Sequence, residues 1–322
     1  MRHVRVEELC AASRVLIVAG KGGVGKTTVT AALATAAART GTSVLIVEVE
    51  GKSGLATSFG VPALEYEEAE VRRGVRARTL TPDHALLEYL EDRGLRRISK
   101  RLVRSGALDV IATAVPGMKD ILVLGKVKQL ERAGVADLII IDAPAAGHAI
   151  TFLTSARGML DSVRVGPVRT QAQDVLDLLS DPTRCRVMLV TLPEETPVNE
   201  LVETAFALEE RVGVSLAPVV VNAMPGDLAV AAHHLSSDVA TAGLDIPSAE
   251  LRALTAAAAF RHERHGLARE QADRLAARLP LPQIRLPYLF SEIGPTEVDA
   301  LADAFTAEVR ALPDTTLRDP AS

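Results

Sequence analysis

Residues 14–39 read RVLIVAGKGGVGKTTVTAALATAAAR, and this stretch decides the expected fold. A continuous apolar run ends at Gly20, a glycine-rich turn follows, and an Ala-rich helical stretch extends from Val29 to Arg39. The turn satisfies the pattern G-x-x-x-x-G-K-[ST], with the strand before it and the helix after it that this motif requires. The order predicts a loop whose backbone N–H groups, together with a helix N-terminus, bind phosphate oxygens.

Individual side chains of this loop have separate expected roles. Lys26 is expected on the β- and γ-phosphates as a catalytic cation, and the Thr27 hydroxyl is expected on Mg²⁺. Asp142 ends a second apolar run, so its carboxylate is expected at the same edge of the sheet, where it would hold Mg²⁺ through water. A glycine turn of purely structural use is the alternative. The residues expected to contact the nucleotide phosphates are Gly22, Gly23, Val24, Gly25, Lys26, Thr27 and Thr28.

Short β-branched runs alternate with Ala-rich stretches along the chain. This alternation predicts an α/β fold with a doubly wound, mostly parallel sheet, and the near-continuous Val, Ile and Leu content indicates strands covered on both faces. The runs lie at 14–20, 43–50, 75–80, 136–143, 184–193, 216–224 and 284–289. Residues 1–322 are predicted to form a single domain. It carries a helical insertion at about 62–134, with helices near 86–98 and 118–132, and a second helical region at about 227–279, including a helix over 248–279.

The composition excludes several classes of protein. The chain has 322 residues, is 48% hydrophobic and carries a formal net charge of −5, so it can bury a core and has no overall attraction to nucleic acid. Aromatic residues are 3% with no Trp, which disfavours base-stacking platforms for nucleic acid. Cys10 and Cys185 lie too far apart for a disulfide framework or a Cys-x-x-Cys zinc site. Without a run of 18 apolar residues, a cytoplasmic protein is expected, with peripheral membrane attachment as a further option.

Several motifs together resemble one known family. Lys21 followed by two glycines resembles the deviant Walker A loop of SIMIBI-class P-loop ATPases. Residues 142–148, DAPAAGH, resemble the switch II of the ArsA/Get family, commonly D-T-A-P-T-G-H. Residues 219–225, VVVNAMP, and 287–294, PYLFSEIG, resemble that family's V-V-N strand end and adenine loop. The resemblance covers roughly 14–311 and is closest to the single-domain actinobacterial members of this anion-transporting ATPase family.

The resemblance implies a dimer that hydrolyses ATP with Mg²⁺. In that family the extra lysine reaches the partner's phosphates, which would make Lys21 catalytic in trans. Gly147 and His148 would relay the nucleotide state as switch II residues. Glu200 mirrors a family glutamate that contacts nucleotide across the dimer, although a carboxylate favoured by a helix N-terminus is an equal alternative. The residues that would contact adenine are Asn222, Pro287 and Leu289.

The chain departs from the family pattern at switch I and in its effector features. The family sequence D-P-A-H-[SN]-L is replaced by EGKSGL at 50–55. Glu50 is expected to orient the attacking water, with Glu48 as a more distant alternative, and the longer side chain predicts slow or partner-dependent hydrolysis. The metalloid cysteine cluster, the zinc cysteines and the Met-rich groove of family members are missing. His262 and His265 are expected to face solvent rather than a metal, and the arginines of the 62–134 insertion to form a solvated helix face.

The favoured function is a dimeric ATPase in which nucleotide state controls capture or release of a client or membrane partner. The alternative is a weakly catalytic nucleotide-binding subunit of a hetero-dimer with a paralogue. A ParA/MinD-like positioning ATPase is less favoured, because the net charge and the lack of a terminal basic patch do not suit it. The expected partners are therefore ATP, a like or paralogous subunit and an unidentified client, and nucleic acid is not expected.

Overall fold

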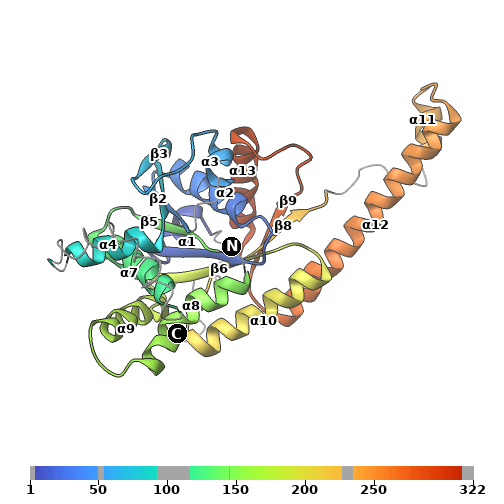
Figure 1. Ribbon diagram of the computed structural model, residues 1–322. Helices are drawn as coiled ribbons and strands as arrows, with labels where there is room; N and C mark the ends of the chain where they lie inside the picture. The colour runs from blue at the N-terminus through green and yellow to red at the C-terminus, as the bar shows by residue number, and fades with distance from the viewer. Residues whose placement is uncertain are drawn as a thin grey trace.

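A computed structural model describes residues 4–49, 54–92, 94, 117–144, 146–226 and 235–313. This part of the chain contains a nine-stranded sheet in the order β3-β4-β2-β5-β1-β6-β8-β9, with the short β7 paired to β6 (Figure 1). Neighbouring strands are parallel except β3 and β4. The strands are β1 Val15–Gly20, β2 Val44–Val49, β3 Ala69–Arg72, β4 Val75–Leu80, β5 Leu138–Asp142, β6 Cys185–Thr191, β7 Ser215–Leu216, β8 Val219–Met224 and β9 Gln283–Pro287.

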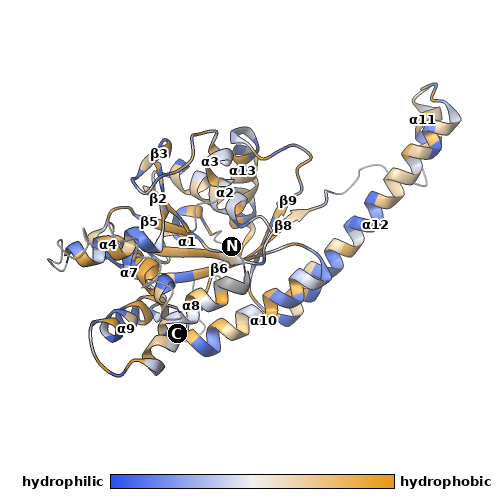
Figure 2. Cartoon of the chain, viewed as in Figure 1, coloured by the Kyte–Doolittle hydropathy of each residue, from blue (hydrophilic) through white to orange (hydrophobic). Residues whose placement is uncertain are grey.

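Helices cover both faces of the sheet, as the sequence predicts for a doubly wound fold. One face packs against α1 Val6–Ala11, α2 Lys26–Arg39, α3 Gly54–Phe59 and α13 Pro295–Ala311. The other packs against α7 Met118–Ala133, α8 Ala146–Ser162, α9 Pro167–Ser180 and α10 Glu195–Val212. The central strands supply both cores by alternation, since Leu16 and Val18 face the first set of helices while Val15 and Ile17 face the second. Figure 2 shows the resulting apolar interior along the sheet.

The 62–134 insertion contains more sheet than its sequence suggests. β4 extends the parallel sheet beside β2, and β3 adds an antiparallel edge. β3 reads AEVR and is largely exposed, so it lacks the apolar run by which buried strands are predicted. Only α4, Pro82–Asp92, and α7 represent the expected helices here, and most of 93–116 lies outside the described residues.

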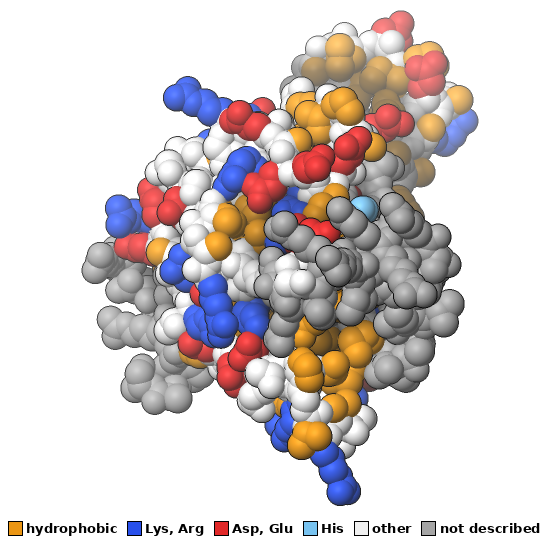
Figure 3. Space-filling view, turned by 60° about the vertical axis from the view of Figure 1, so that its left-hand side comes forward, with side chains coloured by type: hydrophobic (Ala, Val, Ile, Leu, Met, Phe, Trp, Pro, Cys, Tyr) orange, Lys and Arg blue, Asp and Glu red, His pale blue; other side chains and the backbone are white. Residues whose placement is uncertain are grey.

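Four of the arginines expected on a solvated helix face, Arg72, Arg73, Arg76 and Arg78, belong instead to the β3–β4 hairpin. Arg72, Arg76 and Arg78 lie on β3 and β4 and approach carboxylates of Asp299 and Glu68. Arg93, Arg96, Arg97, Arg101 and Arg104 fall outside the described residues. On the part of the surface drawn in colour in Figure 3, basic side chains lie beside acidic ones, so charges there are largely balanced.

The run at 216–224 is divided in the structure. Pro218 separates β7 from β8, because proline has no N–H to donate to a neighbouring strand. The break leaves β7 paired with β6 over two residues, while β8 continues between β6 and β9.

A long helix between β8 and β9 leaves the body of the molecule. This helix, α12 Ser248–Arg278, has 31 residues, and its fully buried residues, Ala268, Ala272 and Leu275, all lie in its C-terminal half. Figure 1 shows its outer half and the short α11, Leu235–Thr241, projecting away from the sheet. Among the residues that the structure describes, no helix combines the length and apolarity needed to cross a bilayer.

Candidate nucleotide site

The glycine-rich loop follows β1 and turns directly into α2. Gly23 and Gly25 have φ of +85° and +87°, a region of backbone conformation that glycine adopts most easily. At Gly25 there is also no space for a side chain, because a Cβ would lie 2.2 Å from Asn222 Nδ2. The loop is therefore shaped by tertiary packing as well as by its own sequence.

The start of α2 makes the loop electropositive. The helix begins at Lys26, with Thr27 and Thr28 in its first turn and no acidic residue there. Lys26 Nζ donates a hydrogen bond to the carbonyl oxygen of Lys21, 3.1 Å away, so its ammonium group lies over the loop. The N–H groups of the first helical turn have no acceptor within the helix, and together with this cation they suit an anion such as phosphate.

Two carboxylates lie beside this anion site at the carboxyl ends of their strands. Glu48 on β2 and Asp142 on β5 are register partners, and both are buried. Thr27 Oγ1 donates to Asp142 Oδ2 at 2.6 Å, and Thr79 Oγ1 donates to Glu48 Oε2 at 3.1 Å. Burial raises the pKa of the Glu48 carboxyl, and the charge of Asp142 raises it further.

These groups line a cavity of about 300 Å³, here called the loop pocket. It is lined by Gly22, Gly23, Gly25, Lys26, Thr27, Glu48, Val49, Asp142, Ala143 and Pro144. Within the described part of the chain, the buried Glu48 Oε1 has no hydrogen-bond partner. A hydroxyl and two carboxylates form an all-oxygen donor set, and one of those oxygens is buried without a partner. Such a set fits a hard divalent cation such as Mg²⁺.

A second cavity of about 720 Å³ extends from the same loop to α12, and we call it the α12 cavity. Gly23 and Gly25 form its inner wall, shared with the loop pocket. Three segments at the carboxyl ends of β6, β8 and β9 form its sides, and the middle of α12 closes it. The lining residues are Gly23, Gly25, Leu192, Pro193, Glu194, Asn222, Ala223, Pro225, Gly226, Phe260, Arg261, Arg264, Leu267, Ala268, Pro287, Tyr288 and Phe290.

Of the predicted adenine contacts, Asn222 and Pro287 line the α12 cavity, whereas Leu289 is partly buried against the core on the face of the sheet covered by α2 and α13. Its neighbours Tyr288 and Phe290 line the cavity instead, as expected from the alternation of side chains in an extended segment.

A β-bulge near the end of β8 aims Asn222 at the loop. The register of β8 with β9 shifts between Val221 and Met224, and Ala223 takes a φ of +56°, which is unusual for a residue other than glycine. Asn222 Nδ2 thereby donates to the carbonyl of Val24 at 2.9 Å. The bond braces the glycine-rich loop from a strand about 200 residues away in sequence.

Lys21 and Glu200 contact one another within a single chain. Lys21 Nζ lies 2.6 Å from Glu200 Oε1, and both side chains are partly exposed. Glu200 is in the second turn of α10, beyond the helix N-terminus at Glu195. The predicted roles of the two residues across a dimer are not tested by this contact.

Three predicted residues have little or no described structure. Glu50 lies outside the described residues. Gly147 and His148 belong to the first turn of α8, directly after β5, but their side chains are not described. Their assigned roles therefore remain predictions.

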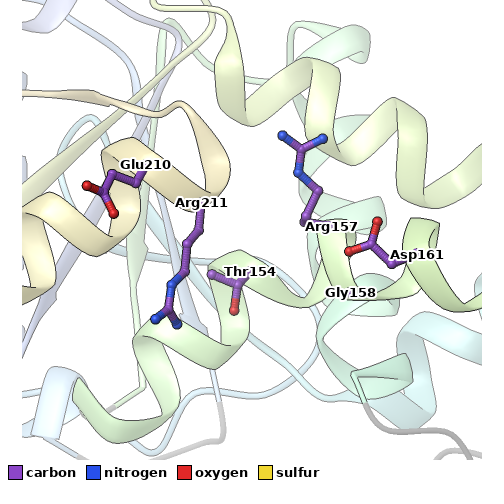
Figure 4. A pocket seen from close by; sticks show the side chains of 6 residues that line it. All are labelled: Thr154, Arg157, Gly158, Asp161, Glu210 and Arg211. Atoms are coloured by element: carbon purple, nitrogen blue, oxygen red, sulfur yellow. The ribbon is translucent and has the colours of Figure 1, made fainter.

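Other polar clusters do not form a comparable site. A groove between α8 and α10 is lined by Thr154, Arg157, Gly158, Asp161, Glu210 and Arg211. Figure 4 shows that the guanidinium groups of Arg157 and Arg211 point in different directions and do not converge on one point. His262 and His265 lie on α12, where His265 Nδ1 donates to the Pro225 carbonyl at 2.9 Å. Cys10 and Cys185 are buried free thiols, and burial raises the pKa of each to about 12.

The geometry of the loop and its neighbours defines a class of protein. A glycine-rich loop leads from a central parallel strand into a helix, with Lys26 and Thr27 at its start and Asp142 on the adjacent strand. This is the arrangement of a P-loop nucleotide-binding protein.

Comparison with known proteins narrows the class to a family. Residues 13–167 match the model of a family described as anion-transporting ATPase. ATPase BagA of Mycobacterium tuberculosis is 34% identical over 85% of this chain and 87% of its own length. ATPase get3 of Schizosaccharomyces japonicus is 29% identical over 43% of this chain and 42% of its own length. The chain belongs to the anion-transporting ATPase family, as the sequence motifs predict, and ATP use at a general level follows from that membership.

Proposed function

We propose that the chain is a Mg²⁺-dependent ATPase that works as a dimer and couples nucleotide state to capture or release of a client or membrane partner. The observation that carries the catalytic part is the 2.6 Å contact between Thr27 Oγ1 and Asp142 Oδ2 under the glycine-rich loop. It joins the hydroxyl and the carboxylate that P-loop enzymes use around the metal.

Separate residues would bind the phosphates, hold the cation and orient the attacking water. The loop amides and the N-terminus of α2 bind the phosphates, and Lys26 leaves the Lys21 carbonyl for a phosphate oxygen. Thr27 and Asp142 hold the cation, which neutralises phosphate charge when bound. Glu48, 4% exposed and beside Asp142, contributes a further carboxylate at the same point. Glu50 remains the residue proposed to orient the attacking water.

Adenine would occupy the α12 cavity. Asn222 Nδ2 already donates to the Val24 carbonyl, and the amide oxygen Oδ1 is the atom not engaged by that bond. An acceptor at this place favours a purine with a 6-amino group over one with a 6-oxo group. This chemistry supports ATP rather than GTP as the ligand.

The dimer would engage Lys21. Its ammonium is partly exposed next to the loop and pairs with the partly exposed carboxylate of Glu200, and such a pair is weak in water. In a nucleotide-bridged dimer, the partner's phosphates would replace Glu200 as the counter-charge. A hetero-dimer with a paralogue would use the same exchange.

The test is ATP turnover by the parent protein and by Lys26→Ala, with Lys119→Ala on α7 as the matched lysine control. We expect Lys26→Ala to lose about 100- to 1,000-fold in turnover, the usual cost of removing one group that stabilises transition-state charge. Turnover that is unaffected by Lys26→Ala would contradict the proposal.

Activity per subunit measured against protein concentration then addresses assembly. A rise that follows dimer formation in sedimentation supports a homo-dimer. If the chain alone stays monomeric and turns over slowly, and a paralogous subunit restores both properties, the active form is a hetero-dimer.

A further inference from the structure

Three of the four aromatic side chains that are exposed in the described part of the chain line one cavity, and the fourth, Phe206, lies elsewhere. In the described part of the chain, eight large apolar side chains are exposed, and four of them, Phe260, Leu267, Tyr288 and Phe290, line the α12 cavity. Phe290 is 79% exposed and Phe260 is 63% exposed. An apolar cluster left open to water in this way indicates a surface that something covers.

The cluster comes from two elements that face each other. Tyr288 and Phe290 follow β9 and make an edge-to-face pair with ring centroids 5.0 Å apart. Phe260 and Arg261 come from the middle of α12, and the Arg261 guanidinium lies 5.2 Å from the centre of the Phe290 ring. Flat rings and a planar cation opposite one another suit a flat aromatic ligand.

The inner half of α12 is fixed to the body of the molecule. Arg274 and Arg278 both donate to Asn199 Oδ1 on α10, at 2.9 and 2.6 Å. The Ala272 carbonyl accepts a hydrogen bond from Gln283 Nε2 on β9. The C-terminal half of the helix therefore keeps its place whatever the cavity contains.

The outer part of the helix has no comparable attachment among the described residues. We call residues 235–259, which include α11, the arm. The turns of the arm in α12 are exposed or partly exposed, and they follow the helix axis away from the sheet (Figure 1). The arm is continuous with the middle of α12, where Phe260, Arg261 and Arg264 line the α12 cavity and Arg264 Nη2 donates to Glu194 Oε1 at 3.4 Å.

We propose that Phe260 and Arg261 of α12 form the outer wall of the base-binding site, so that binding of an adenine nucleotide fixes the direction of the arm. The inference rests on the proposed function, because it takes the ligand of the α12 cavity to be the base of a nucleotide bound at the loop. The shared wall of Gly23 and Gly25 supports this, since a ligand whose phosphates bind the loop extends its base into that cavity.

The first test measures the contribution of the base to binding separately from that of the phosphates. Calorimetry with Mg²⁺ compares ATP with inorganic tripolyphosphate for the parent, Phe260→Ala and Arg261→Ala. Because stacking of a base on an aromatic side chain is worth about 1–3 kcal/mol, we expect each substitution to weaken ATP binding about tenfold. Tripolyphosphate affinity should not change, because that ligand has no base.

Phe206→Ala on α10 is the matched control, since Phe206 is 48% exposed but does not line the cavity. ATP affinity within twofold of the parent in both α12 variants would overturn the inference. If the parent itself binds neither ATP nor tripolyphosphate, the proposed function has failed instead.

The second test measures how widely the position of the arm varies relative to α10. Spin labels at Ser248→Cys on α12 and Glu203→Cys on α10 report their separation, while the buried native thiols Cys10 and Cys185 stay unlabelled. ATP should narrow the distribution of distances in the parent. In Phe260→Ala saturated with ATP, the distribution should stay as broad as without ligand.

An identical narrowing in Phe260→Ala, or no change in the parent at saturation, would contradict the proposal. A second copy of the chain is the other candidate for covering the aromatic cluster. Sedimentation of Phe260→Ala distinguishes it, because loss of dimer with unchanged ATP affinity would assign the cluster to the subunit interface and overturn the inference.

Discussion

The two cavities that meet at the glycine-rich loop are built in opposite ways. The loop pocket is walled by strand ends and buried carboxylates, with Glu48 and Asp142 only 4% and 7% exposed. The α12 cavity is more than twice as large, about 720 Å³ against 300 Å³, and its outer wall is a helix with exposed aromatic side chains. One end of the site is set by the sheet, and the other depends on a projecting element.

The two cavities meet different physical requirements. Phosphate chemistry requires charges held within a fraction of an ångström, which strands in a parallel sheet provide. A base needs only a flat apolar slot and a few hydrogen bonds, which exposed aromatic side chains on a helix can provide. Under the proposed function, the loop pocket holds the phosphates and the cation, and the α12 cavity holds the base.

Removing the Lys21 ammonium group beside the loop should have the largest effect. Under the proposed dimer mechanism, Lys21→Ala should lower turnover about 1,000-fold or more, as loss of a cation supplied in trans does in related phosphoryl-transfer enzymes. Because Lys21 and Glu200 are 43% and 39% exposed, their pair contributes little to folding, and the melting temperature should hardly change. Steady-state phosphate release with a thermal melt checks both, and normal turnover by Lys21→Ala would rule out its catalytic role.

A methyl group at Gly25 should damage both cavities together. Gly25→Ala places a Cβ 2.2 Å from Asn222 Nδ2 at a φ of +87°, so the loop or β8 must shift. We expect ATP affinity to fall about 100-fold, the order expected when a positioned group moves by about 1 Å. Gly41→Ala is the matched control, because Gly41 has a φ of +93° but nothing within 4 Å of the new Cβ. Equal losses of ATP affinity in the two variants would mean that backbone strain, and not the clash with Asn222, is responsible.

Glu48→Gln should weaken the binding of Mg²⁺ without weakening the binding of the base. We expect the Mg²⁺ concentration needed for nucleotide binding to rise about 10- to 100-fold, the usual cost of losing a group that supports a metal site. Binding of ATP without metal should be retained. The control is Glu203→Gln on the exposed face of α10. Titration of Mg²⁺ at fixed ATP measures the effect, and an unchanged Mg²⁺ midpoint would remove Glu48 from the site.

The same substitution has an expected effect on stability. The pKa of Glu48 is raised in the folded protein, so the folded state binds the proton more tightly than the unfolded state. The parent's free energy of unfolding should therefore fall as pH rises from the ordinary value of 4.5 through the raised pKa. Glu48→Gln should lack this fall and be more stable than the parent at neutral pH without Mg²⁺, as denaturant unfolding at several pH values would show.

The smallest effect is expected at the bulge that joins the two cavities. Ala223 has a φ of +56°, where a Cβ costs about 1 kcal/mol that glycine avoids. Ala223→Gly should raise the free energy of unfolding by up to about 1 kcal/mol and leave ATP affinity nearly unchanged, since Asn222 keeps its bond to Val24. Chemical denaturation measures it, and a clear loss of stability would contradict the assignment of strain to this residue.

The place of the glycine-rich loop and of Asp142 at one edge of the sheet was predictable from sequence. Gly20–Thr28 and Asp142 follow apolar runs, and the carboxyl ends of parallel strands meet at one edge of a sheet. Glu48 is predicted only as an alternative to Glu50 for orienting the attacking water, because its position two residues earlier on the strand places it further from the loop. The pairing of β2 with β5 brings it beside Asp142, and no local pattern states which strands will be neighbours.

The α12 wall was not predicted. Residues 248–279 were expected to be helical, and α12 spans Ser248–Arg278, but its mixed polarity gives no sign of a face turned to a ligand. The useful signal was the presence of Phe260 in a chain with only 3% aromatic residues, together with Tyr288 and Phe290 in the loop expected to hold adenine.

The sequence by itself determined the local features: a glycine-rich loop between a strand and a helix, the hydroxyl and carboxylate proposed to hold a cation, and alternating strands and helices. These features depend on residues that are close in sequence and on the spacing of apolar residues, and both can be read from the order of residues. The tertiary structure alone decided that Glu48 lies beside Asp142, that Asn222 braces Val24, and that α12 closes a cavity beginning at Gly25. Each of these depends on segments brought together from distant parts of the chain, because strand order and helix direction result from packing of the whole core.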